Sequence, residues 1–218
     1  PDYYFYLNQS GCSRVDGTDA AAGWRDTLQA LSVIGITDQV QMEMTKLVAA
    51  VLHIGNISFR EEANYAKVLA EDFLQFPSFL LGLSPEDIAA KLTSRTMRSK
   101  WGAQTENIDV LLNVRQAEAA RDAWAKSIYD RLFQFLVAQL NKALHTTSNQ
   151  QLLTMGVLDI YGFEIFEKNG FEQLCINYAN EKLQQHFNEV IFEMESQVYA
   201  QEGVPSAAIE FQDNSRCV

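Results

Sequence analysis

The sequence predicts a mainly α-helical protein with a few short strands, an α+β arrangement, and two observations lead to this fold class. Apolar residues recur at helical spacing over long stretches, most clearly over 115–144, which contains neither glycine nor proline. Strict alternation of apolar and polar residues is confined to short runs such as 57–60 and 108–112. Helices should therefore form most of the core.

Composition limits the classes of protein to consider. The chain has 218 residues, 47% of them hydrophobic, which is enough for a sizeable core. Its net charge of -11 argues against nucleic-acid binding and against contact with anionic membranes, because both require a positive surface. No apolar run approaches the ~20 residues that span a bilayer, and the first residues lack the basic-then-apolar pattern of a secretion signal. Three widely spaced cysteines without a zinc pattern favour a reducing, cytoplasmic setting.

The first half of the chain reads as a series of helices. Four aromatic residues at 3–6 are typical of core packing and precede a turn at 8–11. Asp19 can cap a helix that ends at Gly35, and Thr37 can cap the next one. His53 lies near the end of that second helix, where a carbonyl partner is a simpler explanation than a metal.

Two further elements precede a basic segment. Residues 57–68 indicate a short hairpin or a surface loop, and 69–83 an apolar helical stretch interrupted at Pro77. Ser84 followed by Pro85 and two acids is a strong helix start, and this helix should end near Thr93.

Residues 91–112 indicate a two-stranded projection whose outgoing arm is basic. Lys91, Arg95, Arg98 and Lys100 occur with no acid between them in an otherwise acidic chain. A loop tip at 102–107 and an alternating return strand complete the pattern. A solvated surface hairpin and a binding loop for an acidic partner both fit these residues.

Residues 115–144 predict one long helix of about 45 Å at 1.5 Å per residue. The polar run 145–150 then turns the chain and is the only internal boundary that the sequence indicates. We therefore expect two parts, 1–150 and 151–218.

The second part begins with an apolar run, 152–158, that predicts a strand buried on both faces, followed by a long helix over about 171–201. Between them lie Asp159 and Gly162. An acid at the end of a buried strand can support Mg²⁺ through water, and a glycine lets a backbone N–H approach a phosphate. A helix-cap aspartate followed by a turn glycine is the simpler alternative for these two residues.

The amino-acid sequence around Asp159 and Gly162 is far more specific than the spacing of these two residues alone. The run 158–166 reads LDIYGFEIF and the run 177–188 reads NYANEKLQQHFN, and together they resemble the head of myosin motors. YLNQSG at 6–11, HIGNISF at 53–59 and ARDAWAK at 120–126 extend the resemblance in family order over essentially the whole chain.

The resemblance implies a piece of a P-loop NTPase-type head in which residues 159–164 are switch II. Asp159 would support magnesium, the loop residues Ile160, Tyr161, Gly162 and Phe163 would approach the nucleotide, and Gly162 would contact the γ-phosphate. Glu164 would pair with an arginine of switch I and close the site around the lytic water, so Glu164 and Gly162 are the expected catalytic residues. The following helix would be the relay helix, with a hinge near Asn180 and Glu181.

The same resemblance gives the basic projection a role as the actin-contacting loop. Its expected contacts are Arg95, Arg98, Lys100 and Glu106. Glu106 lies sixteen positions before Asp122 of the ARDAWAK run, where this family carries an acid or a phosphorylatable residue. Trp124 stands where the family motif has leucine. A built-in carboxylate supplies one charge against ~1.5 to 2 for a phosphate, so we expect an actin contact that is not switched at this position.

No GxxxxGK[ST] run occurs in these residues, and no switch I arginine is identified. The resemblance thus implies the upper 50-kDa region after switch I and the start of the lower 50-kDa region of a longer heavy chain. ATP and Mg²⁺ would serve the complete cytoskeletal motor, and the chain alone should bind neither and be inactive. A non-catalytic actin-binding scaffold is the alternative. A kinesin or GTPase fits Asp159 and Gly162 but not the residues that follow.

Overall fold

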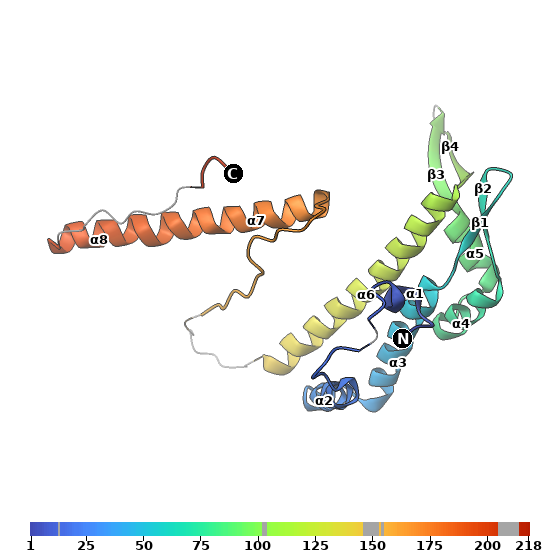
Figure 1. The fold of residues 1–218 in the computed structure, drawn as a ribbon, viewed down its shortest axis with the longest axis horizontal. Coiled ribbons are helices and arrows are strands. Elements are labelled where there is room, and N and C mark those ends of the chain that lie inside the picture. Colours follow the sequence, from blue (N-terminus) through green and yellow to red (C-terminus); the bar gives the residue numbers. More distant parts are fainter. Residues whose placement is uncertain (13, 102–103, 146–152, 154, 205–213) are drawn as a thin grey trace. The chain divides into compact units, whose positions relative to one another are not determined.

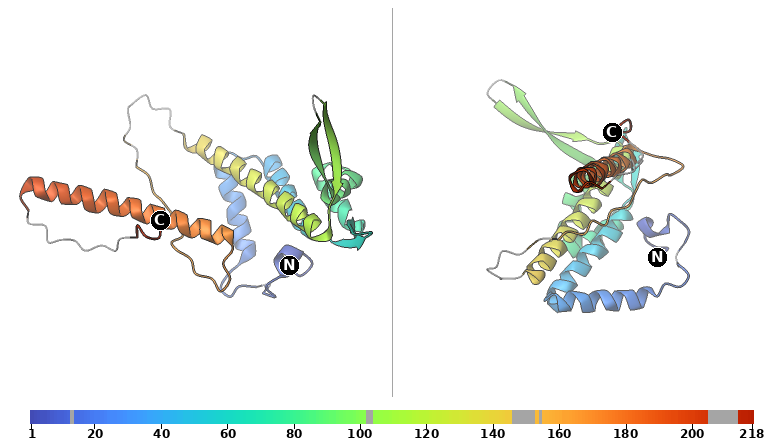
Figure 2. Two further views of the ribbon diagram at one scale, coloured as in Figure 1. Left: turned by 90° about the horizontal axis from the view of Figure 1, so that it is seen from above. Right: turned by 90° about the vertical axis from the view of Figure 1, so that its left-hand side faces the viewer.

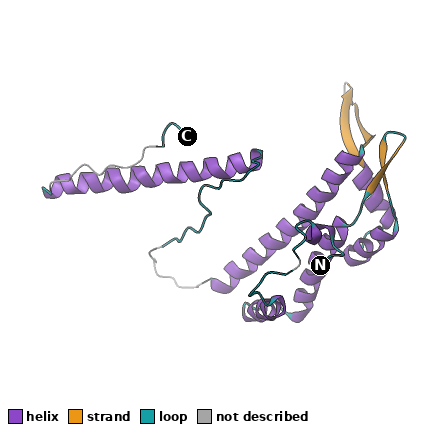
Figure 3. Cartoon of the chain, in the orientation of Figure 1, coloured by secondary structure: helices purple, strands orange, loops and turns teal. Residues whose placement is uncertain are grey.

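The computed structural model describes residues 1–12, 14–101, 104–145, 153, 155–204 and 214–218, with only the backbone described at 99–101, 104–106 and 193. The protein is mainly α-helical, as the sequence predicts, with two short hairpins among the described residues (Figure 3). It divides into two compact units, Pro1–Ser148 and Asn149–Val218.

Unit 1 contains six helices and two hairpins in its described part (Figure 1). In chain order these are α1 (Phe5–Asn8), α2 (Ala20–Val33), α3 (Asp38–Gly55), β1 (Phe59–Glu62), β2 (Tyr65–Val68), α4 (Asp72–Leu81), α5 (Pro85–Thr93), β3 (Ser94–Trp101), β4 (Gln104–Leu111) and α6 (Val114–Leu144).

The long helix α6 organises unit 1 because it contributes to the two apolar clusters found among the described residues. It lies beside α3 (Figure 2). Ala117 is completely buried in one cluster and Leu132 is buried in the other. The first cluster joins α4, α5 and the β1–β2 hairpin, through Ile57, Phe59, Ala66, Val68, Leu74, Ile88 and Leu92. The second joins α6 to α3 through Ile36 and Met44. The small side chain of Ala117 allows α6 to pack closely on the hairpin.

Helix starts in unit 1 follow the capping residues in the sequence. The Asp19 side chain accepts hydrogen bonds from two backbone N–H groups at the start of α2, and that of Ser84 accepts one from Asp87 at the start of α5. Asn113 and Gln116 form a reciprocal capping box at the start of α6. Thr37 occupies the N-cap of α3 but makes no side-chain capping bond, contrary to expectation.

The basic projection is an antiparallel hairpin of β3 and β4 in which Arg95 lies opposite Val110 and Arg98 opposite Asn107. Successive side chains of a strand point to opposite faces, so Arg95 and Arg98 lie on different faces of the hairpin. Its base is fixed by backbone bonds, from Ala66 N to Leu112 O (2.8 Å) and from Leu112 N to Thr93 O (2.9 Å). The hairpin is thus anchored at the start of α6.

In unit 2, the described residues of the stretch before Asp159 form no strand, so the prediction of a buried strand over 152–158 is wrong for them. Their apolar side chains are exposed, with Val157 at 97% and Leu158 at 72%. A buried strand needs neighbouring strands to bond its backbone and layers to cover its faces. The described strands of this chain pair only with each other, as β1–β2 and β3–β4.

The helix expected over 171–201 consists of α7 (Phe171–Asn188), a π-helical segment η1 (Glu189–Glu193) and α8 (Met194–Glu202). Gly203 follows α8 with a positive φ of 68° and lets the chain turn away. Asn180 and Glu181, the predicted hinge, lie within the regular part of α7, and the hinge stays a prediction. In the part of the chain that the structure describes, no helix is long and apolar enough to span a bilayer.

Candidate functional site

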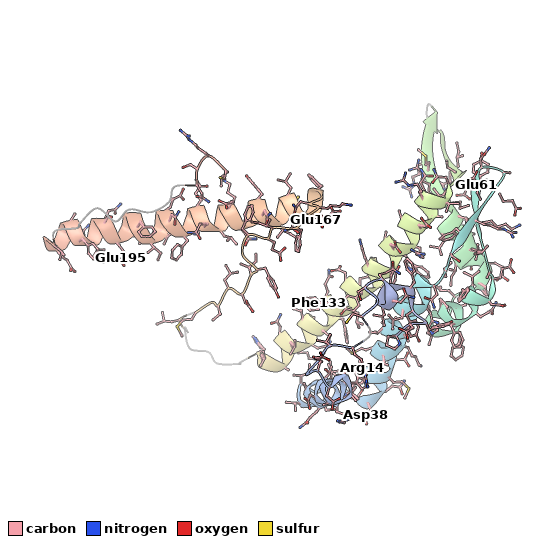
Figure 4. The ribbon with its side chains drawn as sticks, viewed as in Figure 1. Arg14, Asp38, Glu61, Phe133, Glu167 and Glu195 are labelled. Carbon is pink, nitrogen blue, oxygen red and sulfur yellow. The ribbon has the colours of Figure 1, made fainter. Side chains whose placement is uncertain are left out.

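The loop 159–166 is held to one face of α7 by three side-chain amides. They belong to Gln173, Asn177 and Asn180, whose spacing of four and three residues places them on the same side of a helix. The loop and this helix lie in unit 2, near the labelled Glu167 in Figure 4. Gln173 and Asn177 are not among the predicted site residues, although their helical spacing in front of Asn180 is visible in the sequence.

Asn177 holds the backbone of Glu164. The backbone N–H of Glu164 donates to Asn177 Oδ1 at 2.9 Å, and Asn177 Nδ2 donates to Glu164 O at 2.9 Å. This pair of bonds resembles the exchange between two paired strands, and it satisfies both backbone groups of Glu164 in the absence of a neighbouring strand.

Two further amides complete the attachment. Gln173 Nε2 donates to Glu164 Oε2 at 3.0 Å, and Asn180 Nδ2 donates to Gly162 O at 3.3 Å. Asn180 Nδ2 also donates to Ile176 O at 2.9 Å, one turn back on its own helix. The structure therefore attaches three of the predicted site residues to one helix: Gly162 is bonded to Asn180, and Glu164 is bonded to the neighbouring amides Asn177 and Gln173.

The remaining loop residues are exposed. Ile160, Tyr161 and Phe163 expose 50%, 83% and 57% of their surface, and Asp159 is also exposed. A Cβ built on Gly162 meets nothing within 4 Å, so the space beside its backbone is open in this unit. The loop thus presents one carboxylate and a freely approachable glycine backbone.

This donor set fits part of a magnesium–phosphate site. Mg²⁺ in nucleotide sites is held by one or two carboxylates together with water and phosphate oxygens, and Asp159 is one such carboxylate. No group of three or more acidic, histidine or cysteine side chains that could hold a metal occurs among the described residues. Asp159 can contribute a ligand, and the described part of the chain contains no complete set.

A hollow of about 690 Å³ lies beside the loop and the first turns of α7, and Glu164 and Asn177 line it. Glu181 and Cys217 line another part of the wall. Asn214 Nδ2 donates to the carbonyl O and the Oε2 of Glu181 at 2.8 and 2.6 Å, which attaches the segment 214–218 to the helix. Glu181, a predicted hinge residue, is thereby tied to a later part of the chain.

The second predicted site is the β3–β4 hairpin. Arg95 and Arg98 are exposed, and among the described side chains neither forms an ion pair. Thr96 Oγ1 donates to Asp109 Oδ1 across the strands at 2.6 Å, which engages the carboxylate next to Val110, the register partner of Arg95. The side chains of Lys100 and Glu106 lie outside the described residues, and only their backbone register, opposite Thr105 and Ser99, is known.

A buried polar network that the sequence motifs do not predict lies near the start of α6. Arg121 is only 6% exposed; its Nε donates to Asp122 Oδ1 and its Nη1 to Ile57 O, both at 2.8 Å. Its guanidinium lies 5.2 Å from the centre of the Phe5 ring, and Tyr6 Oη donates to Asp122 Oδ1 at 2.6 Å. The sequence contains an indication of this burial, because Arg121 is four residues from both Ala117 and Ala125 and therefore lies on the buried stripe of the helix.

The network changes the pKa values of Tyr6 and Asp122. Burial and the hydrogen bond to Asp122 raise the pKa of the Tyr6 hydroxyl. Burial alone would raise the pKa of Asp122, but the hydrogen bonds from Arg121 and Tyr6 and the charge of Arg121 outweigh it and hold that pKa below its usual value. The carboxylate is therefore charged and bonded in the folded chain.

Comparison with known proteins places the chain in a family. The family model described as myosin head (motor domain) matches residues 1–218. The chain is 43% identical to Myosin-1 of Sclerotinia sclerotiorum over 215 residues, 98% of this chain and 17% of that protein. It is also 43% identical to Myosin-2 of Saccharomyces cerevisiae over 218 residues, 99% of this chain and 14% of that protein. It is 42% identical to Myosin-4 of the same yeast over 223 residues, 100% of this chain and 15% of that protein. The chain thus spans less than a fifth of the length of these relatives, and it belongs to the myosin head (motor domain) family.

Proposed function

We propose that this chain is part of an actin-based molecular motor that couples ATP hydrolysis to movement on actin filaments. The observation that carries the proposal is the family match over all 218 residues, which includes both the loop at 159–164 and the basic hairpin. The chain's partners in this proposal are the actin filament and the remainder of the myosin heavy chain. Its setting is the cytoplasm and its cytoskeleton, and no nucleic-acid or membrane contact is proposed.

In this proposal the loop 159–164 is switch II. Asp159 supports Mg²⁺ through water, and the backbone N–H of Gly162 donates to the γ-phosphate of ATP, with Ile160, Tyr161 and Phe163 forming the rest of the nucleotide-facing loop. Bound Mg²⁺ neutralises charge on the phosphates. Glu164 pairs with a cationic side chain from another part of the motor and closes the site around the attacking water. The exposed Asp159 and the open space beside Gly162 support these roles.

The helix α7 is the relay helix in this proposal. A movement of Gly162 or Glu164 has a direct bonded path to the helix through Asn180, Asn177 and Gln173. Asn180 and Glu181 form the hinge of this coupling. The amide bonds support the connection between loop and helix, whereas motion along the helix is the part that needs a functional test.

The β3–β4 hairpin is the actin contact. Arg95, Arg98 and Lys100 supply positive charge in a chain whose net charge is -11, which suits an acidic partner surface. Glu106 supplies a permanent carboxylate. In this assignment residues 1–150 belong to the upper 50-kDa subdomain and 151–218 begin the lower one.

The test of the catalytic role is Glu164→Ala in the complete motor. Removing the carboxylate should abolish steady ATP hydrolysis while nucleotide binding persists, because the loop backbone that meets the phosphate is retained. The matched control is Glu167→Ala, an exposed acid three residues later in the same segment. Unchanged turnover in Glu164→Ala would remove Glu164 from the mechanism.

A further inference from the structure

The side chain of Glu164 is fixed by a closed set of amide hydrogen bonds. Gln173 Nε2 donates to Glu164 Oε2 at 3.0 Å and to Asn177 Oδ1 at 3.3 Å. A side-chain amide nitrogen carries two hydrogens, so both donors of Gln173 have a partner. Asn177 Oδ1 in turn accepts from the backbone N–H of Glu164, which uses its second lone pair.

The consequence is that Gln173 has little freedom to turn. Gln173, Asn177 and Glu164 are all half-buried, and hydrogen bonds that share partners in a partly desolvated network restrain one another. Because Asn177 fixes the backbone of Glu164 and Gln173 fixes its carboxylate, the two ends of the Glu164 side chain are held separately by residues one helical turn apart.

The bond engages only one carboxylate oxygen. Gln173 donates to Oε2, and within the described residues no hydrogen bond to Oε1 is found. A glutamine is suited to this arrangement because it donates without carrying a charge, and the carboxylate keeps its full negative charge for a cationic partner. A lysine or arginine at position 173 would instead compete for that partner.

We propose that Gln173 is a positioning residue, which orients the Glu164 carboxylate so that its second oxygen is presented to the cationic group that closes the site. The proposal rests on the proposed function, because it concerns the same closing step. The new element is Gln173 itself, a residue of α7 outside the switch II loop that takes part in closing the site.

The experiment uses the complete motor with Gln173→Leu, which keeps much of the side-chain volume and removes both donors. We expect the single-turnover rate of ATP cleavage to fall on the order of 10- to 100-fold, as for the loss of one hydrogen bond to a charged group, while the rate of nucleotide binding changes less than about twofold. Gln173→Glu should slow cleavage further, because two carboxylates would face each other. The matched control is Gln184→Leu on the same helix, whose amide donates to Asn188 rather than to the loop, and it should leave both rates unchanged.

Each outcome decides between the possible roles. Cleavage at the wild-type rate in Gln173→Leu would overturn the proposal, and so would a parallel loss of nucleotide binding, which indicates a merely structural role. If the wild-type motor itself cleaves no ATP, the proposed function fails first. If wild type cleaves ATP, Glu164→Ala does not, and Gln173→Leu matches wild type, only the positioning role fails.

Discussion

At the scale of single residues, Arg121 shows how unit 1 combines packing with polar contacts. Its guanidinium is buried on the inner side of α6, where it bonds Ile57 O and Asp122 and lies over the Phe5 ring. A buried cation is tolerated only when its donors are satisfied, and these contacts provide partners from three parts of the chain. The network therefore ties the N-terminal segment and the residues just before β1 to α6.

The Asp122 carboxylate gives this network a dependence on pH. Its pKa is lower in the folded chain than its usual value, so its contribution to stability is complete above about pH 4 and is lost as the pH falls through the lower, folded-state pKa. Asp122→Asn should cost about 1 kcal/mol at pH 7, a reduced value because the side chain is 39% exposed. Urea unfolding of the chain should show this difference narrowing below about pH 4. The exposed Asp26→Asn serves as the control, and a difference that persists unchanged at pH 3 would contradict the assignment.

Gly55 tests the close approach between α1 and the end of α3. A Cβ at this position would lie 2.7 Å from two atoms of the Tyr6 ring, so Gly55→Ala should displace the ring and destabilise the chain by about 1–3 kcal/mol. Gly23→Ala in α2 is the matched control, because nothing lies within 4 Å of its Cβ, and it should stabilise by about 0.5–1 kcal/mol. Thermal or urea unfolding measures both. Equal effects of the same sign would show that the Tyr6 contact is not tight.

At the scale of elements, local patterns predicted those segments whose partners lie nearby in the sequence. The helix predicted over 115–144 occurs as α6, and the projection predicted over 91–112 occurs as the hairpin β3–β4, because capping residues, apolar periodicity and short turns act locally. The strand over 152–158 did not form at its described positions, because a strand depends on neighbours that periodicity cannot identify. In the candidate site, the motif identified the loop residues but not the amides of Gln173 and Asn177. Their helical spacing is visible in the sequence, but their bonds to Glu164 depend on how the loop lies along α7.

The positive charge of the β3–β4 hairpin gives a prediction about actin binding. Arg98 is exposed and lies on the face opposite to Arg95. Because the side chain is exposed, reversal of its charge should leave the fold unchanged. The reversal should weaken actin binding by the complete motor, because it removes positive charge from the proposed contact. We expect Arg98→Glu to raise the dissociation constant several-fold at low salt, with the difference shrinking as salt screens the charge. Arg60→Glu in the β1–β2 hairpin is the control. Cosedimentation that shows equal affinity for both variants at low salt would argue against the hairpin as the contact.

At the scale of the whole molecule, the described chain contains parts of two sites in two units. Unit 1 carries the basic hairpin before α6, and unit 2 carries the loop and helix that we propose for the nucleotide side. Neither unit contains a phosphate-binding run of the GxxxxGK[ST] kind. The chain spans 14–17% of its compared relatives, so motor activity belongs to the longer protein in our proposal.

We propose, as the central point, that ATP binding at the loop 159–164 changes the affinity of the motor for actin. Cosedimentation of the complete motor with actin filaments, with and without MgATP, tests this coupling most directly. The account predicts that the motor binds actin tightly without nucleotide, that MgATP weakens this binding by at least an order of magnitude through the loop 159–164, and that the 218-residue chain alone shows no such response to ATP. Binding to actin that is the same with and without MgATP in the complete protein would contradict the account and would favour an actin-binding scaffold.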